Sequence, residues 1–195
     1  MSVTATLKAL DFSEALSLVD DGAAFVDLRP TDDYLEVHVP GSLDIVYEAG
    51  PGMAMRARDC IPLDIPLIVI EDPESDALHA AASLKGKGFV VSGKVTDAVN
   101  QWVSNGGQPA STEVVTGSDL PDGMILDVAD PGARIPDGVR STRIPADVLW
   151  HRALEFADEN RVIIAAGYGV RAGLAVGMLE RVEVREVVFW KTGAK

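Results

Sequence analysis

The chain of 195 residues is 47% hydrophobic and 24% charged, the composition of a globular protein with a buried core rather than of a disordered chain. Its formal net charge of −13 argues against nucleic acid as a partner, because phosphate binding needs clustered Lys and Arg. The sequence shows no apolar run of about eighteen residues and no basic segment leading into an apolar one at the N-terminus. We therefore expect no membrane contact, no signal peptide and a cytoplasmic location.

Cysteine usage narrows the chemistry further. Cys60 is the only cysteine, so the chain has no internal disulfide and no cysteine-based metal cluster. His79 and His151 are isolated on helical segments, where a metal-ligand role is not favoured. No metal and no cofactor are expected.

In the first half, the hydrophobic pattern predicts helices and strands in alternation. In chain order these are a helix over 11–19, a strand over 23–28, a strand over 65–70, a helix over 77–87, a strand beginning at 89–91, a helix around Trp102 and a linker over 105–111.

The same order returns after the linker. It comprises a strand over 124–128, a strand over 161–165, a loop over 166–171, a helix over 172–181 and a strand over 186–189. Asp27 and Asp127 lie 100 residues apart, and Leu84 and Leu179 lie 95 apart, which indicates an internal repeat of about 95–100 residues. Alternating strands and helices predict an α/β fold of two tandem domains, each a mostly parallel sheet flanked by helices.

The first copy opens with Asp27-Leu28-Arg29 and continues to His38-Val39-Pro40-Gly41-Ser42. This pattern resembles the rhodanese (thiosulfate sulfurtransferase) family, whose domains open with a strand ending Asp-x-Arg and then carry Gly-His-Ile-Pro-Gly-Ala. The second copy keeps Asp127, has Ala129 in place of the arginine, and echoes the later motif at 134–139. The resemblance implies tandem rhodanese-like domains at 1–108 and 113–195. The second is expected to be shortened, because the first copy continues into a further helix.

In that family the next strand ends in a loop of the type Cys-x-x-Gly-x-Arg-Ser. Alignment on Ala80-Ala81, Leu84 and Gly88-Phe89 places the family's cysteine on Glu71. In the second copy Gly169 and Arg171 match the loop, and the cysteine falls on Ala166. Family members transfer sulfur through a persulfide on a cysteine thiolate. Since neither glutamate nor alanine can form one, the resemblance implies that neither loop is catalytic.

Cys60 precedes the strand that leads to Glu71, so it is expected toward the opposite edge of the sheet from the loops. There a partly buried structural thiol is favoured over a catalytic one. His38 is expected to serve packing and hydrogen bonding.

The two loops differ in charge. The second keeps two glycines and an arginine at a helix start, which makes it a candidate anion site formed by Gly167, Tyr168, Gly169, Val170, Arg171 and Ala172. A merely structural turn is the competing interpretation. The first loop carries four acids between Glu71 and Asp76, for which helix capping is favoured over a cation or basic-partner site. The glycines at 167, 169 and 173 also suggest a dinucleotide fingerprint, but too little chain follows for such a domain.

These observations favour a non-catalytic rhodanese-like protein that acts as a binding or regulatory module with a vestigial anion loop. Its partner would be a small anion or a protein, with homodimerisation left open. One alternative is a weak or atypical sulfurtransferase that uses Glu71 or Cys60, or that completes its site from a second chain. Another is a purely structural dimerisation protein.

Overall fold

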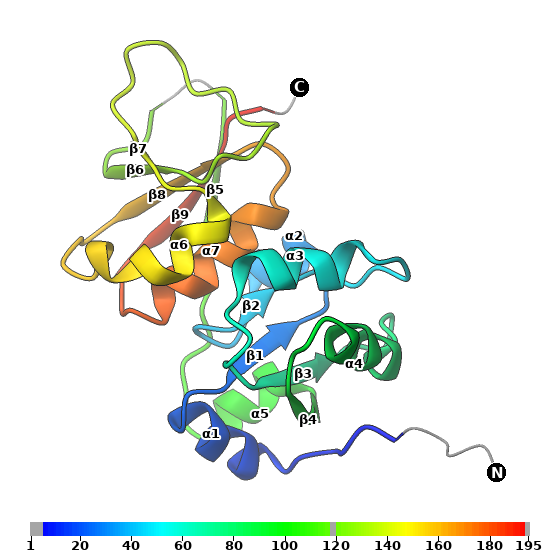
Figure 1. The fold of residues 1–195 in the computed structure, drawn as a ribbon. Coiled ribbons are helices and arrows are strands. Elements are labelled where there is room, and N and C mark those ends of the chain that lie inside the picture. The colour runs from blue at the N-terminus through cyan, green and yellow to red at the C-terminus, as the bar shows by residue number, and fades with distance from the viewer. Residues whose placement is uncertain (1–5, 118–119, 194–195) are drawn as a thin grey trace.

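The computed structural model describes residues 6–117 and 120–193 and contains two sheets, one above the other in Figure 1. The first is built from residues 24–96 and the second from residues 113–191. Within the described residues, every pairing between named strands is parallel, and helices flank both sheets. The predicted α/β fold with mostly parallel sheets is confirmed. None of the described helices is long and apolar enough to cross a membrane.

The first half alternates strands and helices. Its elements are α1 (Phe12–Asp20), β1 (Ala24–Asp27), α2 (Thr31–Glu36), β2 (Leu43–Asp44), α3 (Gly52–Cys60), β3 (Leu67–Glu71), α4 (Ala77–Gly86), β4 (Val91–Thr96) and α5 (Ala98–Ser104).

The second half repeats this plan with fewer helices. Its elements are β5 (Glu113–Thr116), β6 (Met124–Asp127), β7 (Thr142–Arg143), α6 (Ala146–Arg152), the 3₁₀ helix η1 (Ala153–Phe156), β8 (Val162–Ala166), α7 (Val170–Glu180) and β9 (Val187–Lys191).

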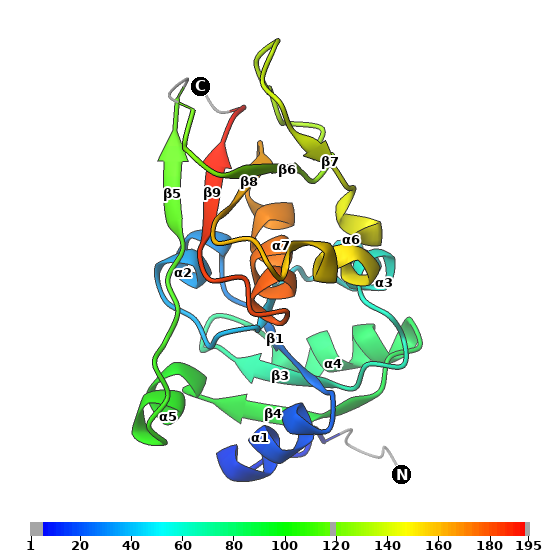
Figure 2. The same cartoon turned by 90° about the vertical axis from the view of Figure 1, so that its left-hand side faces the viewer.

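Four strands of the second sheet, β7-β6-β8-β9, repeat the strand order of the first sheet. The first has the order β2-β1-β3-β4, and the second has the order β5-β9-β8-β6-β7, which Figure 2 shows with β5 at the outer edge. Ala9 makes a single parallel bridge to Lys94 of β4, at the place that β5 takes beside β9. Glu71 and Ala166 are the last residues of the equivalent strands β3 and β8. The alignment of these two positions in the sequence therefore matches the topology.

Strand residues alternate between two apolar layers, which explains the continuous apolar runs in the sequence. In β3, Leu67 and Val69 join a large core that spans both halves, whereas Ile68 and Ile70 pack against α1 and α5 on the other face. In β8, Val162 and Ile164 join the same large core. The two halves are thus held together by one shared apolar core.

Helix α7 is the main element at the junction. It packs against β8 and β9 of its own sheet and also against β2 and α2 of the first half. Two glycines allow this close approach: a Cβ at Gly173 would lie 2.2 Å from the Asp44 carboxylate, and one at Gly177 would lie 2.0 Å from the Ser42 carbonyl oxygen. Next to it, α6 packs against α3, which completes the contact between the halves.

The segment predicted as a linker, 105–111, contains no helix or strand, yet it is fastened to the first half. His38 and Ala110 exchange two backbone hydrogen bonds of 2.9 Å. The indole of Trp102 donates to the carbonyl of Gln108. The connection between the sheets therefore follows a fixed course along the first half.

Candidate functional site

The first loop begins at Glu71, where the family's cysteine would stand. The Glu71 carboxylate is 2.5 Å from the ammonium of Lys94 on the neighbouring strand β4. Both side chains are less than one third exposed. An ion pair therefore occupies the position from which a nucleophile would act.

The other acids of this loop bind its own backbone. Asp76 accepts a 2.9 Å hydrogen bond from the N–H of His79 and so caps α4, and Asp72 accepts one of 2.8 Å from the N–H of Glu74. The Asp76 contact is the one expected of an N-cap residue, whereas the Asp72 contact closes the turn before the helix. A cavity of about 760 Å³ opens beside the loop, and its charged lining consists of Arg29, Glu71, Asp72 and Asp97.

The second loop follows β8, and an internal carboxylate already binds its N–H groups. Asp130 Oδ2 accepts hydrogen bonds from the backbone of Gly167 at 3.1 Å and of Tyr168 at 3.0 Å, and its Oδ1 accepts one from Gly132 at 2.9 Å. The residue is 7% exposed. Asp130 thus takes the place that an external anion would need in order to bind these two N–H groups.

The backbone behind the loop leaves little room. A Cβ added at Gly167 would lie 2.2 Å from the carbonyl carbon of Gly132. The backbone of the second loop is therefore in direct contact with the backbone of the turn that follows β6. Ala129 adopts a left-handed conformation with φ 56° and donates its N–H to Asp127 at 2.8 Å. Arg29 donates to Asp27 in the same way in the first half, at 3.0 Å. The hydrogen bond from the second residue after the aspartate is therefore common to both halves, whereas the left-handed conformation is found at Ala129 and not at Arg29.

Arg171 lies in the first turn of α7, one residue after the helix begins. Its Nη1 donates a 2.7 Å hydrogen bond to the carbonyl of Ala129. The helix starts at Val170 rather than at the expected residue 172, because the positive φ of Gly169 completes the turn before it. One guanidinium nitrogen of Arg171 is thereby committed to holding the loop.

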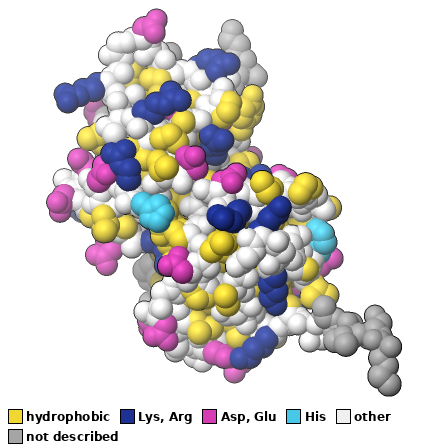
Figure 3. Space-filling model, in the orientation of Figure 1, with side chains coloured by type: hydrophobic (Ala, Val, Ile, Leu, Met, Phe, Trp, Pro, Cys, Tyr) yellow, Lys and Arg dark blue, Asp and Glu magenta, His cyan; other side chains and the backbone are white. Residues whose placement is uncertain are grey.

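A cavity of about 820 Å³ lies between α3 and the loops of the second half. Its charged lining balances three arginines with three aspartates: Arg56, Arg58, Asp59, Asp130, Asp147 and Arg171. Lys and Arg side chains also lie over α3 on the face shown in Figure 3. The cavity lies at the carboxyl ends of the second sheet's strands, where α/β folds bind ligands.

The surroundings of Cys60 in the folded protein were the hardest to predict from the sequence. It lies at the end of α3, before β3. It nevertheless lines the cavity that Arg171 lines from the other half. Sequence reasoning considered only the sheet to which Cys60 belongs, whereas the packing of α3 on α6 brings the thiol to the second half.

The Cys60 thiol is a poor nucleophile in this environment. Burial raises its pKa to about 11, and the neighbouring Asp59 contributes further. At neutral pH it is therefore almost entirely protonated, and the thiolate is the reactive form.

We expect Cys60 in the native protein to react with a thiol-specific disulfide reagent at pH 7 at least about tenfold more slowly than in the urea-unfolded chain. Because Cys60 is the single cysteine, the absorbance of the released thiolate reports on this residue alone. Equal rates in the native and unfolded proteins would contradict the protected thiol.

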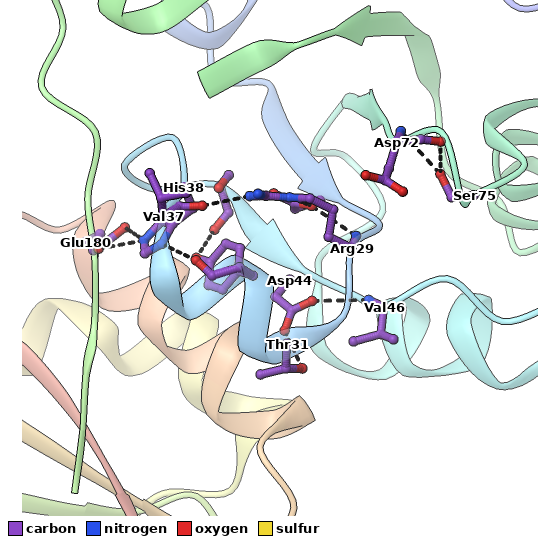
Figure 4. Close-up of polar contacts among 12 residues, drawn as sticks. Arg29, Thr31, Val37, His38, Asp44, Val46, Asp72, Ser75 and Glu180 are labelled. Carbon is purple, nitrogen blue, oxygen red and sulfur yellow. Dashed lines mark hydrogen bonds and ion pairs between the residues drawn. The ribbon is translucent and has the colours of Figure 1, made fainter. Parts of the chain in front are cut away.

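His38 serves the structural role expected for it, but it does so between the halves. Its ring is fully buried and stacks on Tyr34, with ring centroids 4.1 Å apart. Nδ1 is 2.8 Å from the Tyr34 carbonyl, and Nε2 is 3.0 Å from the Glu180 carboxylate at the end of α7, as Figure 4 shows. Within the described part of the chain, no three His, Cys, Asp or Glu side chains gather as a metal site would require.

Sequence reasoning missed Asp130 and Glu180. Asp130 is followed by Pro131 and Gly132, a turn signature that marks a loop but names no partner. Its contact with Gly167 spans 37 residues, and that of Glu180 with His38 spans 142. Only the tertiary structure brings these residues together.

No family model matches the chain, and no curated protein matches it. Among solved structures it is similar to a thiosulfate sulfurtransferase from Pseudomonas aeruginosa, at 17% identity and a TM-score of 0.43 over 97% of this chain and 44% of that one. It is also similar to SseA from Escherichia coli, described as having the rhodanese fold of 3-mercaptopyruvate sulfotransferases, at 14% identity and a TM-score of 0.42 over 97% of this chain and 100% of that one. The BH2092 protein from Bacillus halodurans matches at 19% identity and a TM-score of 0.44, over 53% of this chain and 76% of that one.

Rhodanese-fold sulfurtransferases are thus among the solved structures that this chain resembles. The chain spans less than half the length of the Pseudomonas protein. At these identities and TM-scores the likeness carries no argument about what this chain does.

Proposed function

We propose that the chain is a non-catalytic rhodanese-like protein that binds a small anionic ligand and acts as a binding or regulatory module. The observation that carries this proposal is the state of the three candidate positions for a nucleophile. Glu71 is ion-paired with Lys94, Ala166 has no reactive group, and burial raises the pKa of the Cys60 thiol to about 11. Persulfide chemistry needs an accessible thiolate, which none of them supplies.

The binding element of the proposal is the 820 Å³ cavity between α3 and the second half. Because Asp130 occupies the N–H groups of Gly167 and Tyr168, the ligand would be held by guanidinium groups rather than by the loop backbone. Three aspartates in the lining disfavour a polyanion. The cavity therefore suits a small organic acid or a ligand of low net charge with one anionic group.

The binding proposal is tested at Arg58, which is exposed and lines the cavity. We expect small monocarboxylates to raise the melting temperature of the wild-type protein and to do so less in Arg58→Gln. Arg140→Gln, an exposed arginine outside the lining, is the matched control and should respond as the wild type does. Equal shifts in all three proteins would reject a site in this cavity.

Asp130 gives a second test. Replacing it with Ala removes the acceptor of three backbone N–H groups, so we expect a loss of about 2–3 kcal/mol in the free energy of unfolding. It also frees the loop N–H groups, and sulfate should then raise the melting temperature of Asp130→Ala more than that of the wild type. An equal or smaller shift would show that the loop cannot bind an anion even when it is vacated.

One observation favours the alternative of an atypical sulfurtransferase: Cys60 and Arg171 line the same cavity. The deciding assay measures thiocyanate formation from thiosulfate and cyanide, and pyruvate formation from 3-mercaptopyruvate. We expect no turnover above the protein-free blank for the wild type or for Cys60→Ala. Turnover that the Cys60→Ala change abolishes would overturn the non-catalytic proposal. The structural-dimerisation alternative and the cytoplasmic location stay predictions.

A further inference from the structure

Two buried titratable groups lie under helix α7, where it packs on the first half. One is Asp44 at the end of β2, and the other is the pair formed by His38 and Glu180. Asp44 and His38 are 0% exposed. Figure 4 shows both in one view, with α7 passing beside them.

Asp44 is covered by the helix itself. Its Oδ2 accepts a 2.7 Å hydrogen bond from the hydroxyl of Thr31, and its Oδ1 accepts a 3.3 Å one from the N–H of Val46. The backbone of α7 at Gly173 presses against the carboxylate so closely that no Cβ would fit. Burying a charged carboxylate that has no paired cation costs free energy. The packed helix therefore favours a neutral Asp44.

The charged groups around Asp44 do not reverse this preference. Burial raises its pKa to about 7, and the carboxylate of Asp27 adds to the shift, while the hydrogen bonds and the guanidinium of Arg56 only moderate it. Asp27 is itself paired with Arg29. Tyr34, the remaining titratable neighbour, is held neutral because burial raises its pKa far above the usual range.

The second group needs a proton for a reason of geometry. The carbonyl of Tyr34 can only accept, so Nδ1 of His38 carries a hydrogen. Nε2 then faces both oxygens of Glu180, at 3.0 and 3.2 Å, and the same carboxylate accepts a 2.7 Å hydrogen bond from the N–H of Gly41. A carboxylate and a bare imidazole nitrogen are both acceptors. The contact is satisfied only when one further proton lies between them.

Other charged groups lie near this pair. Glu180 shares a surface cleft with Glu36, Glu113, Arg185 and Glu186. The next residue, Arg181, stacks over Trp150 at 5.3 Å and donates to the carbonyl of Ala23.

We propose that the contact of α7 with the first half is a proton-dependent joint. It is closed when the buried Asp44 is neutral, and it loosens when Asp44 ionises. Because Arg171 lies two residues before Gly173 in α7, loosening the joint would move an arginine of the inter-half cavity.

The sign of the effect follows from linkage. A free aspartate ionises near pH 4, whereas Asp44 under α7 ionises near pH 7. Its contribution to the closed joint is therefore complete below about pH 4 and is lost as the pH rises through 7. The packing of α7 on the first half should therefore be more stable in mild acid than above neutral pH.

Hydrogen exchange of peptides from α7, corrected for the intrinsic pH dependence of exchange, tests the proposal on the full chain. We expect the protection of α7 to fall by about tenfold or more between pH 5.5 and 8.5. Peptides from α4, which lies away from the joint, serve as the internal reference and should change much less. A pH-independent α7, or an α4 that changes in parallel, would overturn the proposal.

Two substitutions assign the effect to these groups. Asp44→Asn mimics the neutral carboxyl, and Glu180→Gln can donate to a neutral His38 while accepting from Gly41. We expect Asp44→Asn to reduce the pH response of α7 several-fold and the double variant to remove it. Asp158→Asn, an exposed carboxyl in the second half, should respond as the wild type does.

A pH response that survives in the double variant would reject the assignment. If Glu180→Gln fails to fold, Asp44→Asn alone decides: an unchanged response in that variant is equally contrary to the proposal.

Discussion

Replacing Arg29 with methionine is expected to lower the free energy of unfolding by about 3–5 kcal/mol, because it leaves a buried carboxylate without its cation. Asp27 is 0% exposed, and Arg29 binds it through Nε at 3.0 Å and Nη2 at 2.7 Å. The same guanidinium also donates to the carbonyl of Val37 at 2.8 Å and so fixes the loop after α2. Urea unfolding at pH 7, followed by circular dichroism, measures the loss.

The internal repeat supplies a matched control for this experiment. Asp127 stands where Asp27 does, but its cation is Arg143 at 3.5 Å, and that side chain is 70% exposed. Solvent screens such a pair, so Arg143→Met should cost less than about 1 kcal/mol. Similar losses in the two variants would show that burial does not distinguish the two ion pairs.

Replacing Gly177 with alanine is expected to destabilise the protein by about 3 kcal/mol. The new Cβ would lie 2.0 Å from the Ser42 carbonyl oxygen, so either α7 or the backbone of the first half has to move. That carbonyl is held by a 2.7 Å hydrogen bond from the hydroxyl of the buried Tyr34 and cannot give way cheaply. The cost of overpacking therefore exceeds the gain of about 1 kcal/mol in helix propensity.

Gly86, at the end of α4, is the control glycine. A Cβ there would meet nothing within 4 Å, so Gly86→Ala should be neutral or stabilising by up to about 1 kcal/mol. Thermal and urea unfolding of both variants give the comparison. A Gly177→Ala protein as stable as Gly86→Ala would mean that α7 can shift freely on the first half.

Much of the fold could be predicted from local patterns. The apolar runs ending at Glu71 and Ala166 form central strands, one in each sheet, because both faces of each sheet are covered. Helices α1 and α4 follow their periodicity to within one or two residues at each end. The repeat gave the equivalence of the two loops. These features depend on sequence neighbours and on burial, which hydrophobic patterns record.

Several helices and strands could not be predicted from the local sequence pattern. Helix α2 has only 6 residues, and α3 begins at a glycine. Strands β2 and β7 have two residues each, and β5 is largely exposed. Such elements are stable because of what packs on them, since short helices and strands are marginal alone. Their positions could not be read from periodicity.

The sequence by itself determined that neither loop carries a cysteine, that one loop is acidic and that the other keeps its glycines and arginine. The tertiary structure decided what those loops do. Asp130 binds the N–H groups of the second loop, α3 brings Cys60 to the cavity beside Arg171, and α7 buries Asp44 and joins Glu180 to His38. The reason is physical: residue types fix which groups exist, whereas the partner and the exposure of each group depend on contacts between segments far apart in the chain.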